Sequence, residues 1–351
     1  MSQELIYTNE VSQAIESVCA AITYDRCYVL CDVNSREEVL PLLTAPVIAD
    51  AKVITVPAGD ASKDVEALTH VWQALIDGGA TRHSLLINVG GGMVCDLGGF
   101  AASTFKRGIA HINIPTTLLA AVDAAVGGKT GINFGGLKNA VGTFSLPRAV
   151  VISTCFFATL PRQELLSGYA EMIKHGLIDG EEHYNALLDG DVTQCDGEQL
   201  LGLLQRSVEV KKRIVEQDPC ENGVRKILNL GHTIGHAFES HALNQGRPIP
   251  HGYAVAWGIV CELLLSHRLL SFPSAIIYDL AHFVESHYGS YAITCEDYGE
   301  LYGYMCHDKK NIGDGVRFAL MRNIGQCVTD VPVEQQEIEI ALDFYRDIFH
   351  L

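Results

Sequence analysis

The chain is poor in basic residues: 25 lysines and arginines stand against 42 aspartates and glutamates, for a formal net charge of −17. This balance argues against a surface for nucleic acid or for an anionic membrane. It does not exclude a small anionic substrate, because a local cluster of cations is enough to bind one. We therefore expect a small molecule as the partner, with no nucleic acid and no membrane.

Other absences narrow the class of protein further. The eleven cysteines form an odd set without a CxxC pair, which favours free thiols in a reducing compartment over a disulfide framework. The start MSQELIYTNE lacks the basic residues and apolar core of a signal peptide. The apolar stretch 254–265 is interrupted by Glu262 and is too short to cross a bilayer. These features predict a soluble, cytoplasmic protein.

The order of apolar patterns predicts the fold class. With 351 residues, 48% hydrophobic and 19% charged, the chain is expected to form about two domains. Short apolar runs alternate with helical patterns at 27–31, 52–56, 84–89, 111–114 and 149–153. Helical spacing follows at 162–177, 199–215, 253–270 and 334–349. We predict an α/β protein: a Rossmann-like parallel-sheet domain over residues 1–160, then a mainly α-helical domain over 161–351.

A glycine-rich turn lies within VGGGMVCDLGGF, residues 89–100, between an expected strand and an expected helix. Glycines let the backbone approach a pyrophosphate closely, and the helix start offers N–H donors. Such a turn is as often structural as functional, and this one is not the GxGxxG fingerprint. Asp32 and Asp60, at strand ends, could bond a dinucleotide or could be turn or cap residues.

A run of polar groups occupies apolar, glycine-rich surroundings in IPTTLLAAVDAAVGGKTGIN (114–133) and GGLKNAVGTF (135–144). Buried polar groups cost free energy unless they are paired, so such a run usually serves a site, although any single member could be a satisfied turn residue. The polar members are Thr116, Thr117, Asp123, Lys129, Lys138 and Asn139.

Three histidines suggest a metal site. His232 and His236 lie one helical turn apart, and His251 follows after a loop. Neutral imidazole ligates divalent metals, but Thr233 excludes the HExxH pattern of metalloproteases. Spacing alone pairs His232 with His236. Glu171 and Lys174, three residues apart on an expected helix, are either a surface ion pair or, if buried, a source of a metal ligand.

Taken together, these motifs resemble the 3-dehydroquinate synthases, NAD- and zinc-dependent cyclases of the shikimate pathway. The resemblance runs from about residue 32 to 325. It rests on GGGMVCDLGGFAAST, IPTTLLAAVDAAVGGKTGIN, AEMIKHG, NLGHTIGHAFE, HGYAVAWG and DKKN, in that order. It implies a homodimer that converts 3-deoxy-D-arabino-heptulosonate 7-phosphate to 3-dehydroquinate and phosphate. The implied steps are transient oxidation by NAD, phosphate elimination, reduction and aldol closure; cobalt could replace zinc.

The resemblance also implies a role for each matching position. The metal ligands would be Glu171, His232 and His251, with His236 on the substrate instead. Residues that match NAD contacts are Asp32, Asn34, Asp60, Lys63, Gly92, Met93, Val94, Cys95, Asp96, Thr116, Thr117, Lys129, Lys138, Phe156, Phe157, Ala158 and Thr159. Residues that match catalytic and substrate contacts are Arg107, Asp123, Lys129, Asn139, Lys174, Lys211, Arg225, Asn229, His236 and Lys310.

The implied substrate carries a phosphate and a carboxylate. Lys129, Asn229, His236 and Lys310 would hold the phosphate, and Lys211 and Arg225 the carboxylate. Asp123, Glu171 and the metal would hold the hydroxyls, and Arg107 would come from a neighbouring subunit. The choice of Lys310 over Lys309 stays open.

Two positions depart from the family pattern. Asp60 replaces the usual glutamate, and Tyr253 replaces the glutamate of HGE. The first is expected to shorten a cofactor contact and weaken NAD binding, the second to repack the wall near the metal.

Three alternatives stay open at this stage. A metal-dependent polyol dehydrogenase would share the glycine-rich sheet and the metal site, but it would accumulate NADH and release no phosphate. A related sugar-phosphate cyclase would act on another substrate. A non-catalytic NAD- or metal-binding regulator would show no turnover. The concentration of lysines and arginines at the matching positions favours the cyclase.

Overall fold

The computed structural model describes residues 3–135, 137–307 and 315–351. The chain forms two compact units. The first comprises Met1–Pro161 and Asp196–Val208, and the second comprises Arg162–Cys195 and Glu209–Leu351. A single cut after residue 160 therefore leaves out the segment 196–208, which belongs with the first unit.

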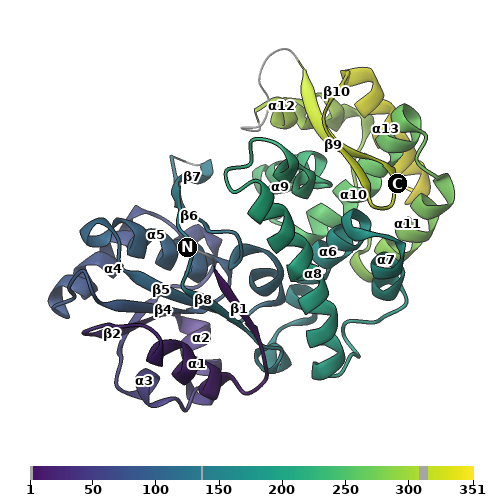
Figure 1. Cartoon of the computed structure of the whole chain (residues 1–351). Helices are drawn as coiled ribbons and strands as arrows, with labels where there is room; N and C mark the ends of the chain where they lie inside the picture. Colours follow the sequence, from purple (N-terminus) through teal and green to yellow (C-terminus); the bar gives the residue numbers. More distant parts are fainter. Residues whose placement is uncertain (1–2, 136, 308–314) are drawn as a thin grey trace. The chain divides into compact units, whose positions relative to one another are not determined.

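The first unit is built on a six-stranded parallel sheet (Figure 1). In spatial order the strands are β1 (Glu4–Tyr7), β8 (Ala149–Ile152), β5 (Ala110–Pro115), β4 (Leu85–Gly90), β2 (Cys27–Asp32) and β3 (Lys52–Val56). The predicted fold class is confirmed, and the five predicted strands end within one residue of those observed. The edge strand β1 was missed, because its four residues are too few to show a pattern.

Helices cover both faces of this sheet, which explains why its strands are continuous apolar runs. Figure 1 shows α1 (Val11–Ala20), α2 (Val33–Glu38) and α3 (Pro46–Ala49) on one face, and α4 (Val65–Asp77) and α5 (Gly92–Thr104) on the other. Every residue of β4 is buried. Leu30, Ile54 and Leu86 of the sheet pack against Val71 and Leu97 of α4 and α5.

A β-hairpin, β6 (Lys129–Phe134) and β7 (Leu137–Phe144), extends the first unit and was not predicted. Its glycine, lysine and asparagine residues are poor strand formers. Hydroxyl groups fix it instead: Thr143 contacts both Thr130, at 2.9 Å, and Ser103 of α5, at 2.8 Å. The hairpin places Lys129, Lys138 and Asn139 on ordered strands.

The second unit is mainly α-helical, as predicted. Its helices are α6 (Arg162–Asp179), α7 (Glu181–Leu188), the second half of α8 (Gly197–Gln217), α9 (His232–Asn244), α10 (His251–Leu270), α11 (Ser274–Tyr288), α12 (Tyr298–His307) and α13 (Gln335–Ile348). The strands β9 (Val316–Asn323) and β10 (Gln326–Val333), which were not predicted, form an antiparallel hairpin in this unit. Ser266 of α10 accepts the Met321 N–H at 3.0 Å and fixes this hairpin to the helical core.

Helix α10 is the buried helix that the sequence predicts. By length and composition it could cross a membrane, but 72% of its most apolar window is buried within the fold. The core helix of a soluble protein passes the same test.

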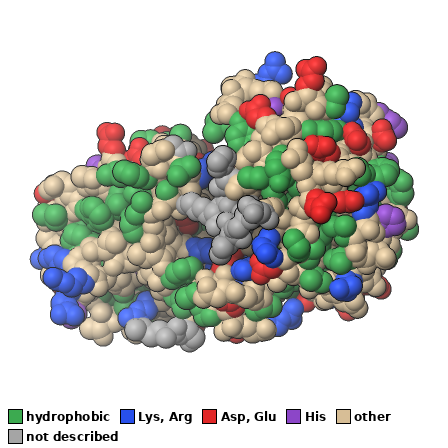
Figure 2. Space-filling model, turned by 90° about the horizontal axis from the view of Figure 1, so that it is seen from above, with side chains coloured by type: hydrophobic (Ala, Val, Ile, Leu, Met, Phe, Trp, Pro, Cys, Tyr) green, Lys and Arg blue, Asp and Glu red, His purple; other side chains and the backbone are tan. Residues whose placement is uncertain are grey.

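On the face drawn in Figure 2, acidic and basic side chains lie interspersed among scattered hydrophobic ones.

His111 on β5 is expected to make the first unit sensitive to acid. Its side chain is buried, and Nε2 has no hydrogen-bond partner among the described residues. Burial, together with the Arg148 charge, lowers the pKa of His111 to about 4. Between about pH 6.5 and pH 4, the His111 imidazole is therefore protonated in the unfolded chain but stays neutral in the folded chain. The free energy of unfolding decreases as the pH falls through this window.

The shift corresponds to about 3 kcal/mol of unfolding free energy lost between pH 7 and pH 4. Urea denaturation at both pH values should show that His111→Leu, which cannot take up this proton, loses less stability on acidification than the wild type. Equal losses in the two proteins would contradict the assignment.

Candidate functional site

The glycine-rich turn joins β4 to α5 as the sequence predicts. Gly90 ends the strand, Gly91 is the N-cap residue and Gly92 starts the helix. A Cβ at Gly91 would lie 3.3 Å from the Thr117 Cγ2 atom, so a larger residue would crowd the loop after β5. The Thr116 N–H donates to the Gly90 carbonyl at 3.0 Å and ties that loop to the turn. The turn and the first turn of α5 thus form a compact N–H surface suited to a pyrophosphate.

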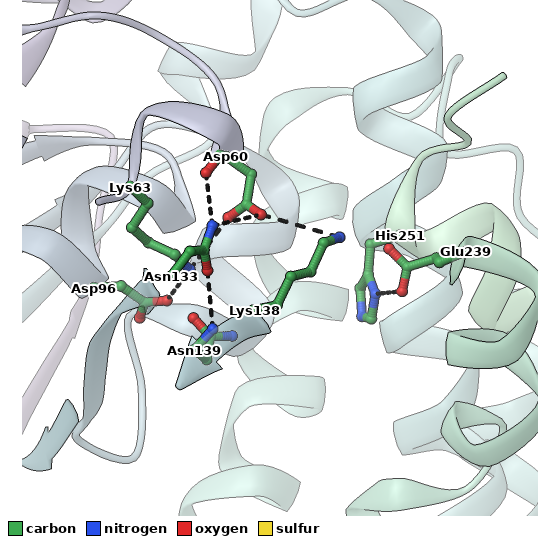
Figure 3. Close-up of polar contacts among 8 residues, drawn as sticks. All are labelled: Asp60, Lys63, Asp96, Asn133, Lys138, Asn139, Glu239 and His251. Carbon is green, nitrogen blue, oxygen red and sulfur yellow. Dashed lines mark hydrogen bonds and ion pairs between the residues drawn. The ribbon is translucent and has the colours of Figure 1, made fainter. Parts of the chain in front are cut away.

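A charged network lies beside this turn (Figure 3). The Lys63 side chain is almost fully buried, and its Nζ lies 3.0 Å from Asp96 Oδ2 and 3.2 Å from Asp60 Oδ1. Burial raises the pKa of Asp96 to about 6, although Lys63 opposes the shift. Burial would lower the pKa of Lys63, but Asp96 and Asp60 outweigh it and raise that pKa. Asp60 therefore reaches Lys63 despite being shorter than the family's usual glutamate.

Asn133 connects this network to the β6–β7 hairpin and was not singled out from the sequence. Its Nδ2 donates to the Asp60 carbonyl at 2.9 Å, and its Oδ1 accepts the Asn139 N–H at 2.9 Å. Lys138 Nζ lies 4.0 Å from Asp60 Oδ2 (Figure 3). Four residues of the predicted NAD set, Asp60, Lys63, Asp96 and Lys138, therefore converge, together with the predicted substrate contact Asn139.

The other predicted residues of the first unit take varied positions. Asp32 is the N-cap residue of α2, and its Oδ1 accepts the Ser35 N–H at 2.8 Å. This is the cap role that the sequence left open as an alternative to a dinucleotide contact. Asn34, in the first turn of α2, is exposed. The remainder are Gly92, Met93, Val94 and Cys95 in the first turn of α5, partly buried Asp123 in the π-turn 120–124, exposed Lys129 at the start of β6, and Phe156, Phe157, Ala158 and Thr159 in the 3-10 helix after β8.

Arg107 lies on a strained, exposed turn after α5. Lys106 and Arg107 both have positive φ, 48° and 69°, and Gly108 follows at 113°. Left-handed backbone at two successive residues other than glycine costs free energy and is more common at functional sites than elsewhere.

In the second unit, Glu171 of α6, His232 of α9 and His251 of α10 form one potential metal centre. Their ligand atoms lie within 4.8 Å of one another. Glu171 Oε1 is 3.3 Å from His232 Nε2 and 3.4 Å from His251 Nε2. The Glu171 carboxylate is fully buried, and among the described residues neither of its oxygens receives a hydrogen bond of good geometry. An acid and two imidazoles, three protein ligands in all, fit the donor set of a catalytic zinc site.

Contacts with groups outside the ligand set orient both imidazoles towards this centre. His232 Nδ1 lies 3.1 Å from the Leu230 carbonyl, and His251 Nδ1 lies 3.1 Å from Glu239 Oε2 (Figure 3). Such partners fix the ring orientation and leave Nε2 as the ligand atom. Glu239 was not singled out from the sequence, although it lies three residues after His236 and seven after His232, on the same helix face.

Glu171 and Lys174 are in contact and both are buried, so the alternative of a surface ion pair is wrong. Burial would raise the pKa of Glu171, but Lys174 and His232 hold it well below the usual range. Burial and Lys174 lower the pKa of His232 to about 3. Burial would also lower the pKa of His251, but Glu239 and Glu171 raise it to about 10. His232 is therefore neutral at pH 7, and metal binding must displace a proton from His251.

His236 lies beside the other two histidines. The ring centroid of His236 is 5.3 Å from that of His232 and 5.9 Å from that of His251, so the three imidazoles cluster. His236 nevertheless shares a possible ligand set with Glu239 and His251, and not with Glu171. The resemblance assigns the metal to Glu171, His232 and His251, and His236 to the substrate.

Three further predicted residues lie in the second unit, one of them on α8 and the other two beside one loop. Lys211 of α8 is buried. Arg225 is 2% exposed, and its Nη1 donates to the Pro219 carbonyl at 2.6 Å. Asn229 Nδ2 donates to Glu221 Oε1 at 2.8 Å. The predicted contact Lys310 lies outside the described residues. Lys211 and Arg225 are therefore not part of a solvent-exposed basic surface.

Tyr253 belongs to an aromatic group. Its ring centroid lies 5.0 Å from Tyr288 and 5.9 Å from Trp257, both in edge-on geometry. An aromatic residue thus fills the position after His251 and Gly252 where the family pattern has a glutamate.

Comparison with known proteins settles the family. Two family models match the chain: "3-dehydroquinate synthase N-terminal" over residues 53–167 and "3-dehydroquinate synthase C-terminal" over residues 168–311. This chain belongs to the 3-dehydroquinate synthase family. The 3-dehydroquinate synthase of Parabacteroides distasonis is 47% identical over 348 residues, 99% of both chains. That of Pyrococcus furiosus is 46% identical over 229 residues, 65% of this chain and 67% of the relative.

Solved structures of related cyclases share the fold. The 2-epi-5-epi-valiolone synthase of Streptomyces hygroscopicus with NAD+ and Zn2+ is 25% identical, with a TM-score of 0.85 and coverage of 99% of this chain and 97% of its own. A 2-deoxy-scyllo-inosose synthase complexed with carbaglucose-6-phosphate, NAD+ and Co2+ is 24% identical, with a TM-score of 0.84 and coverage of 99% and 96%. The predicted family, fold class and enzyme type, a 3-dehydroquinate synthase, are thereby confirmed.

Proposed function

We propose that this chain converts 3-deoxy-D-arabino-heptulosonate 7-phosphate to 3-dehydroquinate and phosphate with NAD and one divalent metal, zinc by preference. The observation that carries the proposal is the convergence of Glu171, His232 and His251, from three helices, on one position. When bound, the metal polarises the substrate's hydroxyl oxygens, and NAD accepts and later returns a hydride. The donor set also accepts cobalt.

Buried cations of the second unit suit the anionic substrate. Arg225 presents a planar fork that can bind a carboxylate through two hydrogen bonds, and Lys211 adds a point charge. Both are buried, so their charges are weakly screened by water. We assign the carboxylate to Lys211 and Arg225. Asn229 and His236, with Lys310 outside the described residues, are assigned to the phosphate.

The first unit supplies the NAD contacts. The N–H groups of the turn 90–92 and of the start of α5 suit the pyrophosphate, while Asp60, Lys63 and Lys138 supply donors and acceptors for the remaining polar groups. The resemblance also assigns Lys129, Asp123 and Asn139 to the substrate. These residues hold the reactants in one orientation, an effect that can contribute roughly 7–11 kcal/mol to lowering a barrier.

Removal and return of the two cofactors tests the proposal. Protein treated with a chelator and freed of NAD should form no 3-dehydroquinate. Activity should return only when NAD and either Zn2+ or Co2+ are both added. Full activity without metal would contradict the assigned role of Glu171, His232 and His251.

We further propose that the active form is a homodimer in which Arg107 acts on the site of the neighbouring subunit. The strained, exposed turn at Lys106 and Arg107 supports a functional role for this side chain. Arg107→Ala and His251→Ala should each be inactive alone. Subunits of the two variants, mixed and allowed to exchange, should regain about a quarter of the wild-type activity by random pairing. Exchange without any regained activity would contradict action between subunits.

The cytoplasm is the proposed location. All eleven cysteines are free thiols in the structure, and such a set is typical of a reducing compartment.

A further inference from the structure

Helix α9, which carries His232 and His236, begins without a local cap. Its N-cap residue is Gly231, which has no side chain to accept the N–H groups of the first turn. Those N–H groups have no partner within a helix and need an acceptor from elsewhere. The first helical residue is His232 itself, so the free energy of this helix start bears directly on a metal ligand.

Glu262 of α10 supplies the missing acceptors. Its Oε2 accepts the Gly231 N–H at 2.6 Å, and its Oε1 accepts the Ile234 N–H at 3.2 Å. The side chain is fully buried. A carboxylate at a helix N-terminus also opposes the helix dipole, and hydrogen bonds to a charged acceptor are stronger than neutral ones. Glu262 thus accepts one hydrogen bond from the backbone before His232 and one from the backbone after it.

The backbone around these two hydrogen bonds leaves little freedom. Gly231 has φ of 80°, and a Cβ there would lie 2.4 Å from Ile259 Cγ1. The ring of His232 is held by the carbonyl of Leu230, two residues earlier in the chain. Because α10 carries His251 at its start and Glu262 three turns later, the helix that provides one ligand also fixes the helix that provides another.

We propose that Glu262 is a positioning residue that sets the affinity of the metal centre by holding His232 in place. The proposal rests on the proposed metal ligands Glu171, His232 and His251. Burial of a carboxylate is expensive, and an apolar side chain of similar volume would pack this core position at lower cost. The role of the buried Glu262 carboxylate is to accept hydrogen bonds from the two N–H groups at the start of α9.

Glu262→Gln tests the proposal, since the amide keeps the shape but offers only one acceptor oxygen and turns an NH2 group towards an N–H. Co2+ is the probe, because its visible absorption reports the ligand geometry. The variant should bind Co2+ roughly 10–100-fold more weakly than the wild type, the usual loss for an outer-shell partner, with an altered absorption spectrum. NAD binding and the far-UV circular dichroism spectrum should both be unchanged, which shows that both units are folded.

Ser266→Ala is the matched control. Ser266 is equally buried, lies one turn further along α10, and accepts the Met321 N–H, so its loss also leaves a buried group unpaired. It should lower stability while leaving Co2+ affinity and spectrum intact. Glu262→Asp, which keeps the charge but shortens the reach, serves if Glu262→Gln does not fold; it too should weaken Co2+ binding.

Wild-type Co2+ affinity and spectrum in a folded Glu262 variant would overturn the role of Glu262. An equal loss in Ser266→Ala would overturn it as well, because general destabilisation would then explain the effect. Failure of the wild type itself to bind one Co2+ would instead refute the proposed metal centre.

Discussion

His251→Ala is expected to abolish enzymatic activity and tight metal binding while leaving the fold intact. The change removes one of two imidazole ligands, so the loss of affinity should exceed the roughly 10–100-fold that follows the loss of an outer-shell partner. The His251 side chain is 29% exposed, so water can fill the space that it leaves. Its ion pair with Glu239 is lost too, so the thermal midpoint should fall without unfolding the protein.

Zinc content after dialysis, activity and the thermal midpoint check this prediction together. His282→Ala on α11 is a suitable control, because that histidine is exposed and outside the ligand set. It should keep one zinc and full activity. Retention of a full equivalent of tightly bound zinc in His251→Ala would refute the ligand assignment.

Gly258→Ala is expected to cause a large loss of stability. Helices α9 and α10 cross in close contact, and a Cβ at Gly258 would lie 2.1 Å from the Gly231 carbonyl oxygen and 2.8 Å from the Gly235 nitrogen. Both atoms belong to the backbone and cannot rotate away, so the helices must separate. Overpacking of this kind typically costs about 1–3 kcal/mol, and a clash with backbone belongs at the upper end. Since α9 and α10 carry His232 and His251, metal affinity should fall as well.

Gly202→Ala in α8 provides the comparison for urea denaturation. No described atom other than its own helix backbone lies within 4 Å of a Cβ at Gly202, so alanine there should stabilise the helix by about 0.5–1 kcal/mol. A Gly258→Ala protein with wild-type stability and metal affinity would show that the contact between α9 and α10 is not tight.

The parts of the fold that the sequence predicts are those with a local pattern. The central strands of the sheet are buried on both faces, so they are largely apolar runs such as AVVI of β8. The β6–β7 and β9–β10 hairpins were missed because contacts from α5 and α10, such as those of Ser103 and Ser266, hold them in place. No local pattern in their own residues signals such contacts.

The metal centre, too, could not be predicted from local sequence patterns alone. Helical spacing brings His232 and His236 together, and their rings are indeed adjacent. The meeting of Glu171, His232 and His251 depends on how α6, α9 and α10 pack, which no spacing along the chain encodes. The family resemblance supplied that set. In the sequence Glu262 is visible only as an interruption of an apolar stretch, and its role follows only from two hydrogen bonds across helices.

The activity itself is tested most directly by following phosphate and NADH together. Purified protein is incubated with NAD, Zn2+ and 3-deoxy-D-arabino-heptulosonate 7-phosphate. We predict one phosphate released for each 3-dehydroquinate formed, over many turnovers, with no accumulation of NADH. Accumulation of NADH in step with substrate loss, without release of phosphate, would contradict the account and indicate a dehydrogenase.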